Sequence, residues 1–267
     1  MAGRKIYKIT ILGAGRLGST LAVSLSKRHR VIVSDPNPER LAMLARQSRN
    51  IAAAASNEEA IRESSVIIFA VKPSVIIQTI ALLKQLLAGK LVVSCAAGTS
   101  LKKIEAATGP ARVIRLMPNI CAEVGEGMLA YAPGMQATAE DESVFVLLFS
   151  PLGRCLKIDE GQLNAITAAS GSGPAFLAFF AKSIHEAAVE SGLSEETAKI
   201  AVAQTLMGTG KLLLSGKTFD DIISTVASPG GTTEAGLKAL EAKGVKAAIK
   251  EAITDAIKKA KELEEKS

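Results

Sequence analysis

The chain has 267 residues, of which 48% are hydrophobic and 22% are charged. This length allows one large domain or two, and this balance is typical of globular proteins and excludes disordered and collagen-like chains. The longest apolar stretches, residues 66–71 and 174–181, are shorter than the roughly 18 to 20 residues that cross a bilayer, so we expect no membrane partner. Residues 1–8 lack the apolar core of a signal peptide, and we therefore expect a cytoplasmic location.

Cysteine, histidine and charge patterns exclude several further classes of site. Cys95, Cys121 and Cys155 show no paired spacing, and neither His29 nor His185 has a cysteine near it, so we expect no disulfide framework and no bound metal. The formal net charge is +6, but the lysines near the C-terminus are interleaved with acidic residues. Aromatic residues make up only 3% of the chain, which leaves few stacking platforms for bases. We expect no nucleic-acid partner.

Residues 1–159 alternate between short β-branched runs and Ala- and Leu-rich stretches of helical spacing. The runs that we expect to form strands are residues 6–12, 31–33, 66–71, 91–94 and 113–116. Clear helical stretches between them are residues 17–27 and 75–87. Continuous apolar strands joined by helices predict a parallel sheet covered on both faces. We therefore predict an α/β Rossmann-type doubly wound domain over residues 1–159.

Residues 160–267 lose the strand-like runs and are predicted to be all helical. The stretch 174–191 is apolar almost all round, and a domain of this size covers such a helix only partly, so we expect burial against a second subunit and at least a homodimer. Gly192 is expected to stop this helix, and Ser194 to cap the next one. Gly208 and Gly210 lie inside that next helix, where they predict a kink or a close approach.

A glycine-rich segment points to a dinucleotide. Gly13-Ala14-Gly15-Arg16-Leu17-Gly18 follows a predicted strand and opens an apolar helix. The first glycine permits the tight turn, the second lets backbone amides approach a pyrophosphate, and the third lets the helix pack closely on the strand. Asp35 ends the second strand, where a carboxylate accepts hydrogen bonds from the ribose hydroxyls of NAD and disfavours a 2′-phosphate. We expect NADH to be favoured, while Arg40, one turn further on, keeps NADPH possible.

Two clusters rich in glycine and hydroxyl residues interrupt the helical half, at residues 170–175 and 228–233. Each immediately precedes a predicted helix. Two interpretations stay open: well-capped helix starts, or exposed amides and hydroxyls that hold a small acidic substrate.

These features resemble those of the pyrroline-5-carboxylate reductase family, whose members catalyse the last step of proline synthesis. Six segments carry the resemblance in the same order and spacing across nearly the whole chain: residues 13–18, Ala70-Val71-Lys72-Pro73, Cys95-Ala96-Ala97-Gly98, Arg115-Leu116-Met117-Pro118-Asn119, residues 170–175 and residues 228–233. The resemblance implies a Rossmann domain and an all-α dimerisation domain whose helices interlock with a partner, in assemblies as large as a decamer.

The resemblance also implies the site residues. Cofactor contacts are expected at Gly13, Ala14, Gly15, Arg16, Leu17, Gly18, Asp35, Asn57, Ala70, Val71, Lys72, Pro73, Cys95, Ala96 and Ala97. The substrate carboxylate is expected at the loop of Ser228, Gly230, Gly231, Thr232 and Thr233, with the Thr233 hydroxyl beside the ring nitrogen. The implied reaction is hydride transfer from NAD(P)H to the C=N carbon of 1-pyrroline-5-carboxylate, giving L-proline. A protonated imine is already activated, so alignment and electrostatics suffice and no strong base is needed.

Two features depart from the family pattern: many members carry an acid and a His-Pro pair where this chain has residues 215–219, and short polar residues are often found where this chain has Asp35. Two alternatives also remain. A hydroxyacid dehydrogenase similar to 6-phosphogluconate dehydrogenase has the same layout, but needs a lysine acid or base near the start of the first long helix, where Lys182 is the nearest candidate. A non-catalytic dinucleotide-sensing protein needs only the first domain, and leaves the 228–233 cluster as a helix start.

Overall fold

The computed structural model describes residues 5–266 of the chain. These residues form two compact units, which we call the sheet unit (residues 5–172 and 256–266) and the helical unit (residues 173–255). This division by compactness places residues 160–172 in the sheet unit. The domain boundary that we predict between residues 159 and 160 stays a prediction. Residues 1–4, on which part of the location prediction rests, and residue 267 lie outside the described residues.

Eight strands form one sheet in the order β3-β2-β1-β4-β5-β6-β7-β8. Their bounds are β1 Lys8–Leu12, β2 Arg30–Ser34, β3 Ile51–Ala53, β4 Val66–Phe69, β5 Leu91–Ser94, β6 Arg112–Met117, β7 Gly127–Pro133 and β8 Gly153–Lys157. All neighbours are parallel except β6 and β7, which are antiparallel. The chain runs outward from β1 through β2 to β3 and then crosses to β4 on the other side of β1. This reversal leaves a crevice at the carboxyl ends of β1 and β4.

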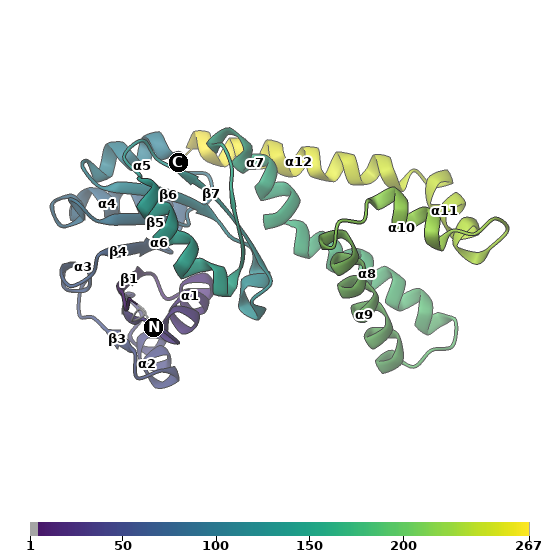
Figure 1. Ribbon diagram of the computed structural model, residues 1–267, viewed down its shortest axis with the longest axis horizontal. Helices are drawn as coiled ribbons and strands as arrows, with labels where there is room; N and C mark the ends of the chain where they lie inside the picture. Colours follow the sequence, from purple (N-terminus) through teal and green to yellow (C-terminus); the bar gives the residue numbers. More distant parts are fainter. Residues whose placement is uncertain (1–4, 267) are drawn as a thin grey trace. The chain divides into compact units, whose positions relative to one another are not determined.

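Helices cover both faces of the sheet (Figure 1). In the sheet unit they are α1 Arg16–Ser26, α2 Pro38–Gln47, α3 Asn57–Arg62, α4 Pro73–Leu87, α5 Leu101–Thr108, α6 Ala139–Phe149 and α7 Leu163–Ile166, with short turns η1 Ile120–Val124, η2 Ser150–Leu152, η3 Glu160–Gln162 and η4 Thr167–Gly171. Successive strand residues point to opposite faces, so Ile9 and Ile11 pack with α1, α2 and α6, while Ile67 and Phe69 pack with α3, α4 and α5. The predicted doubly wound architecture is confirmed.

The helical unit consists of α8 Gly173–Glu190, α9 Glu195–Leu214, α10 Phe219–Val226, α11 Thr232–Ala242 and the first part of α12 Val245–Lys266. Its all-helical character is as predicted. Gly192 ends α8 with a positive φ of 103°, and the Ser194 hydroxyl accepts a hydrogen bond from the Thr197 amide as the N-cap of α9. Helix α9 runs without a break through Gly208 and Gly210, and within residues 5–266 no atom lies within 4 Å of a Cβ placed on either.

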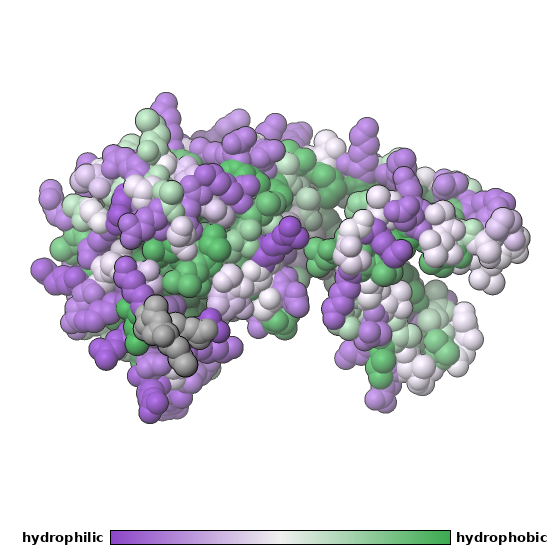
Figure 2. Space-filling view, viewed as in Figure 1, coloured by the Kyte–Doolittle hydropathy of each residue, from purple (hydrophilic) through white to green (hydrophobic). Residues whose placement is uncertain are grey.

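The helical unit has almost no core within one chain. Among its residues only Gly173 and Ala198 are buried. Large apolar side chains are exposed instead on α8 and α9, with Leu177 58%, Phe179 69% and Ile200 61% accessible. Figure 2 shows apolar side chains at the surface of this unit. Leaving this much apolar area in water is unfavourable, so the faces of α8 and α9 require a partner.

The last turns of α12 pack in the sheet unit through a buried arginine. Arg115 of β6 is 6% exposed, and its Nη1 lies 2.9 Å from Oε1 of both Glu160 and Glu264. Asn164 donates a 2.8 Å hydrogen bond to the other Glu264 oxygen. Burial alone would raise the pKa of the Glu264 carboxyl, but the Asn164 and Arg115 hydrogen bonds and the charges of Arg115 and Lys103 hold that pKa below its usual range. The Glu264 carboxylate is therefore ionised at neutral pH.

Among residues 5–266, every helix is too short or too polar to span a bilayer. No group of three or more His, Cys, Asp or Glu side chains in the same residues is arranged to hold a metal ion.

Candidate functional site

A cavity of about 660 Å³ opens at the carboxyl ends of the strands, where the strand order reverses. It is lined by Leu12, Gly13, Gly15, Ser34, Asp35, Pro36, Arg40, Ala55, Ser56, Asn57, Glu58, Ala70, Val71, Lys72, Val75 and Thr79. Seven of the predicted cofactor residues are therefore brought together here: Gly13, Gly15, Asp35, Asn57, Ala70, Val71 and Lys72. Ala14, Gly18, Pro73 and the residues from Cys95 to Ala97 do not line it.

The three glycines of the segment 13–18 have different surroundings. Gly13 has a φ of +102°, and a Cβ on it would lie 2.6 Å from the carbonyl oxygen of Ala70. A Cβ on Gly18 would clash with the carbonyl oxygen of Gly13. Gly15 differs, because within residues 5–266 no atom beyond Gly15 itself and its two chain neighbours lies within 4 Å of the position its Cβ would take. Packing therefore explains Gly13 and Gly18, whereas the open space above Gly15 fits the close approach of a ligand's phosphates to the backbone.

Gly15 is also the N-cap of α1, and no side chain caps this helix. The first amides of a helix lack partners inside it and carry the positive end of its dipole. Together with the space above Gly15, they make a cradle suited to the pyrophosphate of a dinucleotide.

Asp35 at the end of β2 has a second task that the sequence did not reveal. Its Oδ2 accepts a 2.7 Å hydrogen bond from the Ala14 amide, and its Oδ1 accepts a 2.8 Å bond from the Asn37 amide. The carboxylate is only 6% exposed, and Nη1 of Arg40 lies 3.9 Å from Oδ2. Asp35 thus braces the glycine loop as well as facing the cavity, and a cation stands beside it.

Asn57 of α3 and Lys72 at the start of α4 also line the cavity. Asn57 is the first residue of α3, and its Oδ1 accepts a 2.8 Å hydrogen bond from the Ser34 hydroxyl. Within residues 5–266 its amide nitrogen makes no hydrogen bond, which leaves two donors for a ligand. Lys72 is the N-cap residue of α4, and Pro73 is the first residue of that helix.

Cys95 follows β5, and its amide continues the ladder to the Phe69 carbonyl at 3.0 Å. Burial raises the pKa of the Cys95 thiol to about 12, so the sulfur is neutral at physiological pH and is unsuited to act as a nucleophile. Ala96 is buried in the core below. The predicted contacts of Cys95, Ala96 and Ala97 with the cofactor stay predictions.

A smaller pocket of about 240 Å³ lies beside the start of α1. Its lining is Arg16, Leu17, Thr20, Pro118, Asn119, Ile120, Ala122, Glu123 and Gly171. Asn119 is fixed on both sides of its amide, because Oδ1 accepts from the Met128 amide at 3.1 Å and Nδ2 donates to Ser170 at 3.2 Å. Arg16 and Leu17 thus line this pocket and not the larger cavity.

Glu123 is the residue of this region that sequence reasoning missed. Its two carboxylate oxygens accept hydrogen bonds from Arg16, from Nε at 2.6 Å and from a terminal nitrogen at 3.1 Å. The hydrogen bond and the charge of Arg16 lower the pKa of the Glu123 carboxyl. A separation of 107 residues leaves no spacing signal from which this pair could be predicted.

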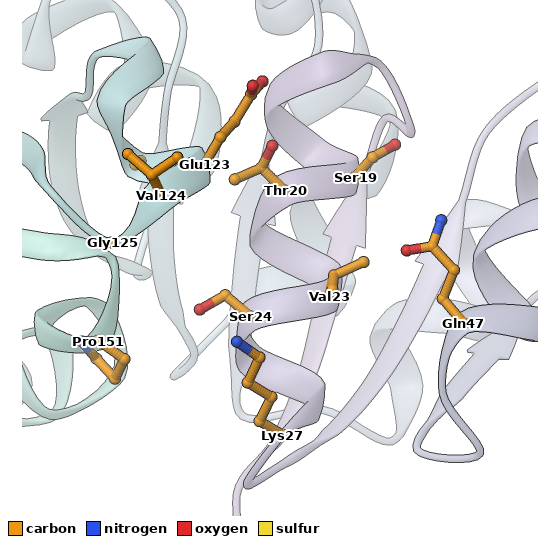
Figure 3. A pocket seen from close by; sticks show the side chains of 11 residues that line it. Ser19, Thr20, Val23, Ser24, Lys27, Gln47, Glu123, Val124, Gly125 and Pro151 are labelled. Atoms are coloured by element: carbon orange, nitrogen blue, oxygen red, sulfur yellow. The ribbon is translucent and has the colours of Figure 1, made fainter. Parts of the chain in front are cut away.

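A third pocket, of about 570 Å³, lies between α1 and the turns η1 and η2 and holds none of the predicted site residues (Figure 3). Ser19 and Thr20 line it, but their hydroxyls donate to backbone carbonyls of the α1 region at 3.1 and 3.0 Å. Lys27, Gln47, Glu123 and apolar residues of the neighbouring turns also line it. The arrangement in this pocket gives no chemistry beyond a polar groove.

The substrate loop, defined as residues 228–233, belongs to the helical unit and is described within that unit. The Gly230 amide donates to Oε2 of Glu234 at 2.8 Å, and the Gly231 amide donates to the Ser228 carbonyl at 3.0 Å. These two amides are therefore already used inside the loop. The Lys238 side chain and the Gly230 amide lower the pKa of the Glu234 carboxyl, which keeps it charged.

The hydroxyls of Thr232 and Thr233 remain available. Both residues lie in the first turn of α11, whose N-cap is Gly231 and which has no side-chain cap. Thr232 is exposed and Thr233 is half-buried. Within residues 5–266 neither hydroxyl makes a hydrogen bond, so Thr233 does not act as a helix cap. Its predicted role at a substrate nitrogen stays a prediction.

Comparisons with known proteins bear on both halves of the chain. Residues 160–263 match the family model described as pyrroline-5-carboxylate reductase dimerisation, and residues 8–98 match the model described as NADP oxidoreductase, coenzyme F420-dependent. The chain is 35% identical to the pyrroline-5-carboxylate reductase of Pisum sativum over 264 residues, covering 96% of each chain. It is 34% identical to the enzyme of that name from Escherichia coli (strain K12), covering 96% of this chain and 98% of that one.

Solved structures agree. The structure of Plasmodium falciparum pyrroline carboxylate reductase with NADP bound has a TM-score of 0.87 and 28% identity, covering 97% of this chain and 98% of that one. The same two-part architecture and the same helical dimerisation domain are present here. On these grounds the chain belongs to the pyrroline-5-carboxylate reductase family.

Proposed function

We propose that the chain is an NAD(P)H-dependent reductase that converts 1-pyrroline-5-carboxylate to L-proline. The observation that carries the proposal is the open space above Gly15, at the strand crossover and at an uncapped helix start, in a chain of this family. A bound reduced nicotinamide supplies the hydride. The protein binds the cofactor and the substrate, orients them, and holds the proton on the ring nitrogen.

The glycine loop and the first amides of α1 would bind the pyrophosphate, and Asn57 and Lys72 line the same cavity. The first-turn amides of α11 and the hydroxyls of Ser228, Thr232 and Thr233 are the groups of the substrate loop that remain to hold a carboxylate, because the amides of Gly230 and Gly231 are used inside the loop. The Thr233 hydroxyl would hold the proton on the ring nitrogen. These roles require no strong base, since the iminium is already electrophilic.

We further propose that NADH is preferred over NADPH. The Asp35 carboxylate is buried and fixed by two amides, so it cannot turn away from a 2′-phosphate. Arg40 is 54% exposed and lies beside it, which lets the site accept NADPH with lower efficiency. The cytoplasmic location and the assembly beyond a dimer stay predictions.

The hydroxyacid dehydrogenase alternative receives no support from the lysine it needs. Lys182 is 72% exposed on α8 and pairs with Glu186 at 3.6 Å within its own helix. This is the arrangement of a solvated surface residue, not of a buried acid or base.

A steady-state assay tests the proposal. The purified protein is mixed with 1-pyrroline-5-carboxylate and either NADH or NADPH, and cofactor oxidation and proline formation are both followed. We expect proline to form with both cofactors and kcat/KM to be higher with NADH. Absence of turnover with either cofactor would overturn the proposed reaction, and a clear preference for NADPH would overturn the role given to Asp35.

A further inference from the structure

The glycine loop is held from two sides by carboxylates that lie far from it in the sequence. On one side Asp35, at the end of β2, accepts the Ala14 amide at 2.7 Å. On the other side Glu123, in η1, accepts two hydrogen bonds from the Arg16 side chain. Gly15, the residue with open space above it, lies between these two attachment points.

The Glu123 attachment is a fixed point because η1 is itself held by the sheet. A Cβ on Gly127 of β7 would lie 2.9 Å from Ala122, so strand and turn are in close contact there. Gly125 ends η1 in the left-handed region with a φ of +78°, and its amide donates to the Ala122 carbonyl at 3.2 Å. Asn119, just before η1, is fixed to Met128 of the same strand.

The pair also determines where the Arg16 side chain goes. Arg16 is the first residue of α1, and its two-point hydrogen bond directs the guanidinium into the wall of the 240 Å³ pocket that Glu123 shares. The guanidinium is therefore turned toward η1, while the Arg16 backbone stays at the cradle above Gly15. A two-point contact restrains orientation as well as distance, which a single hydrogen bond does not.

We propose that Glu123 is a positioning residue for the dinucleotide: through Arg16 it holds the start of α1 in the conformation that receives the pyrophosphate. The inference rests on the proposed function only in taking NAD(P)H as the ligand. A loop that is already ordered loses less conformational freedom on binding, so the pair lowers the cost of binding without touching the ligand.

The test measures NADH binding directly, by fluorescence titration without substrate, in a double-mutant cycle of Glu123→Gln and Arg16→Gln. We expect Glu123→Gln to raise the Kd of NADH about three- to tenfold in the presence of Arg16, and to change it little in the Arg16→Gln background. Melting temperatures of all four proteins verify folding, which an exposed pair should not endanger.

A matched control uses the Lys8–Glu63 pair, an exposed ion pair of 2.9 Å in the same unit. Neither residue lines the 660 Å³ cavity or the 240 Å³ pocket. Glu63→Gln should leave the Kd of NADH unchanged. An unchanged Kd in Glu123→Gln, an equal effect in both Arg16 backgrounds, or an equal effect of Glu63→Gln would each overturn the inference. Failure of the proposed function would show differently, as NADH binding without reduction of 1-pyrroline-5-carboxylate.

Discussion

The sheet unit and the helical unit differ in how much of their structure a single chain completes. The sheet unit buries two apolar clusters, one on each face of the sheet, and hydrogen bonds fix Asp35 and Asn57 in its cavity. In the helical unit only Gly173 and Ala198 are buried, and Phe179 is 69% exposed. The cofactor side of the site is thus preorganised within one chain, whereas the helices that carry the substrate loop depend on a second copy.

The largest effect should follow from a charge on the exposed apolar face of α8. Phe179→Asp replaces a large side chain that we expect to be buried between two subunits, and each dimer carries the change twice. We expect loss of the dimer at micromolar concentration by light scattering, together with loss of turnover. Leu82→Asp is the control, because Leu82 is 78% exposed on α4 of the sheet unit and should tolerate the charge. A stable dimer of Phe179→Asp would contradict the claim that the helical unit depends on burial of the α8 face against a second copy.

The next largest effect concerns the buried arginine that anchors the end of α12. Arg115→Leu leaves the carboxylates of Glu160 and Glu264 without their cation, and breaking such a pair costs about 3 kcal/mol of unfolding free energy. Denaturant unfolding followed by circular dichroism measures this. Lys8→Met, which breaks the exposed pair with Glu63, should cost less than about 1 kcal/mol. Equal losses of unfolding free energy in the two variants would show that the buried Arg115 pairs stabilise the fold no more than an exposed ion pair does.

Thr233→Ala should lower catalysis without lowering stability. Loss of a hydrogen bond to a charged nitrogen costs about 1.5 to 3 kcal/mol, or roughly tenfold to a hundredfold in kcat. Because Gly231, not Thr233, caps α11 and the Thr233 hydroxyl is without a partner in residues 5–266, the melting temperature should barely move. Thr254→Ala, at an exposed hydroxyl on α12 of the same unit that has no role at the site, is the matched control. A destabilised Thr233→Ala enzyme with normal turnover would contradict the assigned role.

The smallest effect is expected at the cofactor's adenosine end. Asp35→Ser removes the charge that disfavours a 2′-phosphate, and should narrow the ratio of kcat/KM for NADH over NADPH about three- to tenfold. It also removes the brace on Ala14, so KM should rise for both cofactors. Asp35→Asn keeps one oxygen for the Ala14 amide, and should change the ratio with less effect on the two KM values. An unchanged kcat/KM ratio in both variants would show that another residue determines the preference for NADH over NADPH.

The predictable part of the fold is the part that is buried on both faces. Strands β1, β2, β4, β5 and β6 are continuous apolar runs, and each was predicted within a few residues of its bounds. The missed strands differ: β3 has three residues, β8 carries Arg154 and Lys157, and the apolar run of β7 lies between Gly127 and Pro133. β3 and β8 are the edge strands, which need little hydrophobic patterning, whereas β7 was missed because the glycine and proline at its ends indicate turns.

The predictable part of the site is the part set by backbone geometry. Glycine spacing identified the loop at Gly13, and strand position identified Asp35, and both line the cavity. Side-chain pairs that join distant segments, such as Arg16 with Glu123, have no local pattern and appear only once the chain is folded. The same holds for the internal hydrogen bond that uses the Gly230 amide.

The most direct test of the central claim is isotopic. The protein is incubated with 1-pyrroline-5-carboxylate and NADH that carries deuterium at both C4 positions of the reduced nicotinamide ring, and the product is analysed by mass spectrometry and NMR. We expect L-proline with a single deuterium at C5, the former C=N carbon, formed in equal amount to the cofactor oxidised. Absence of proline, or proline without deuterium at C5, would contradict direct hydride transfer to the imine by this protein.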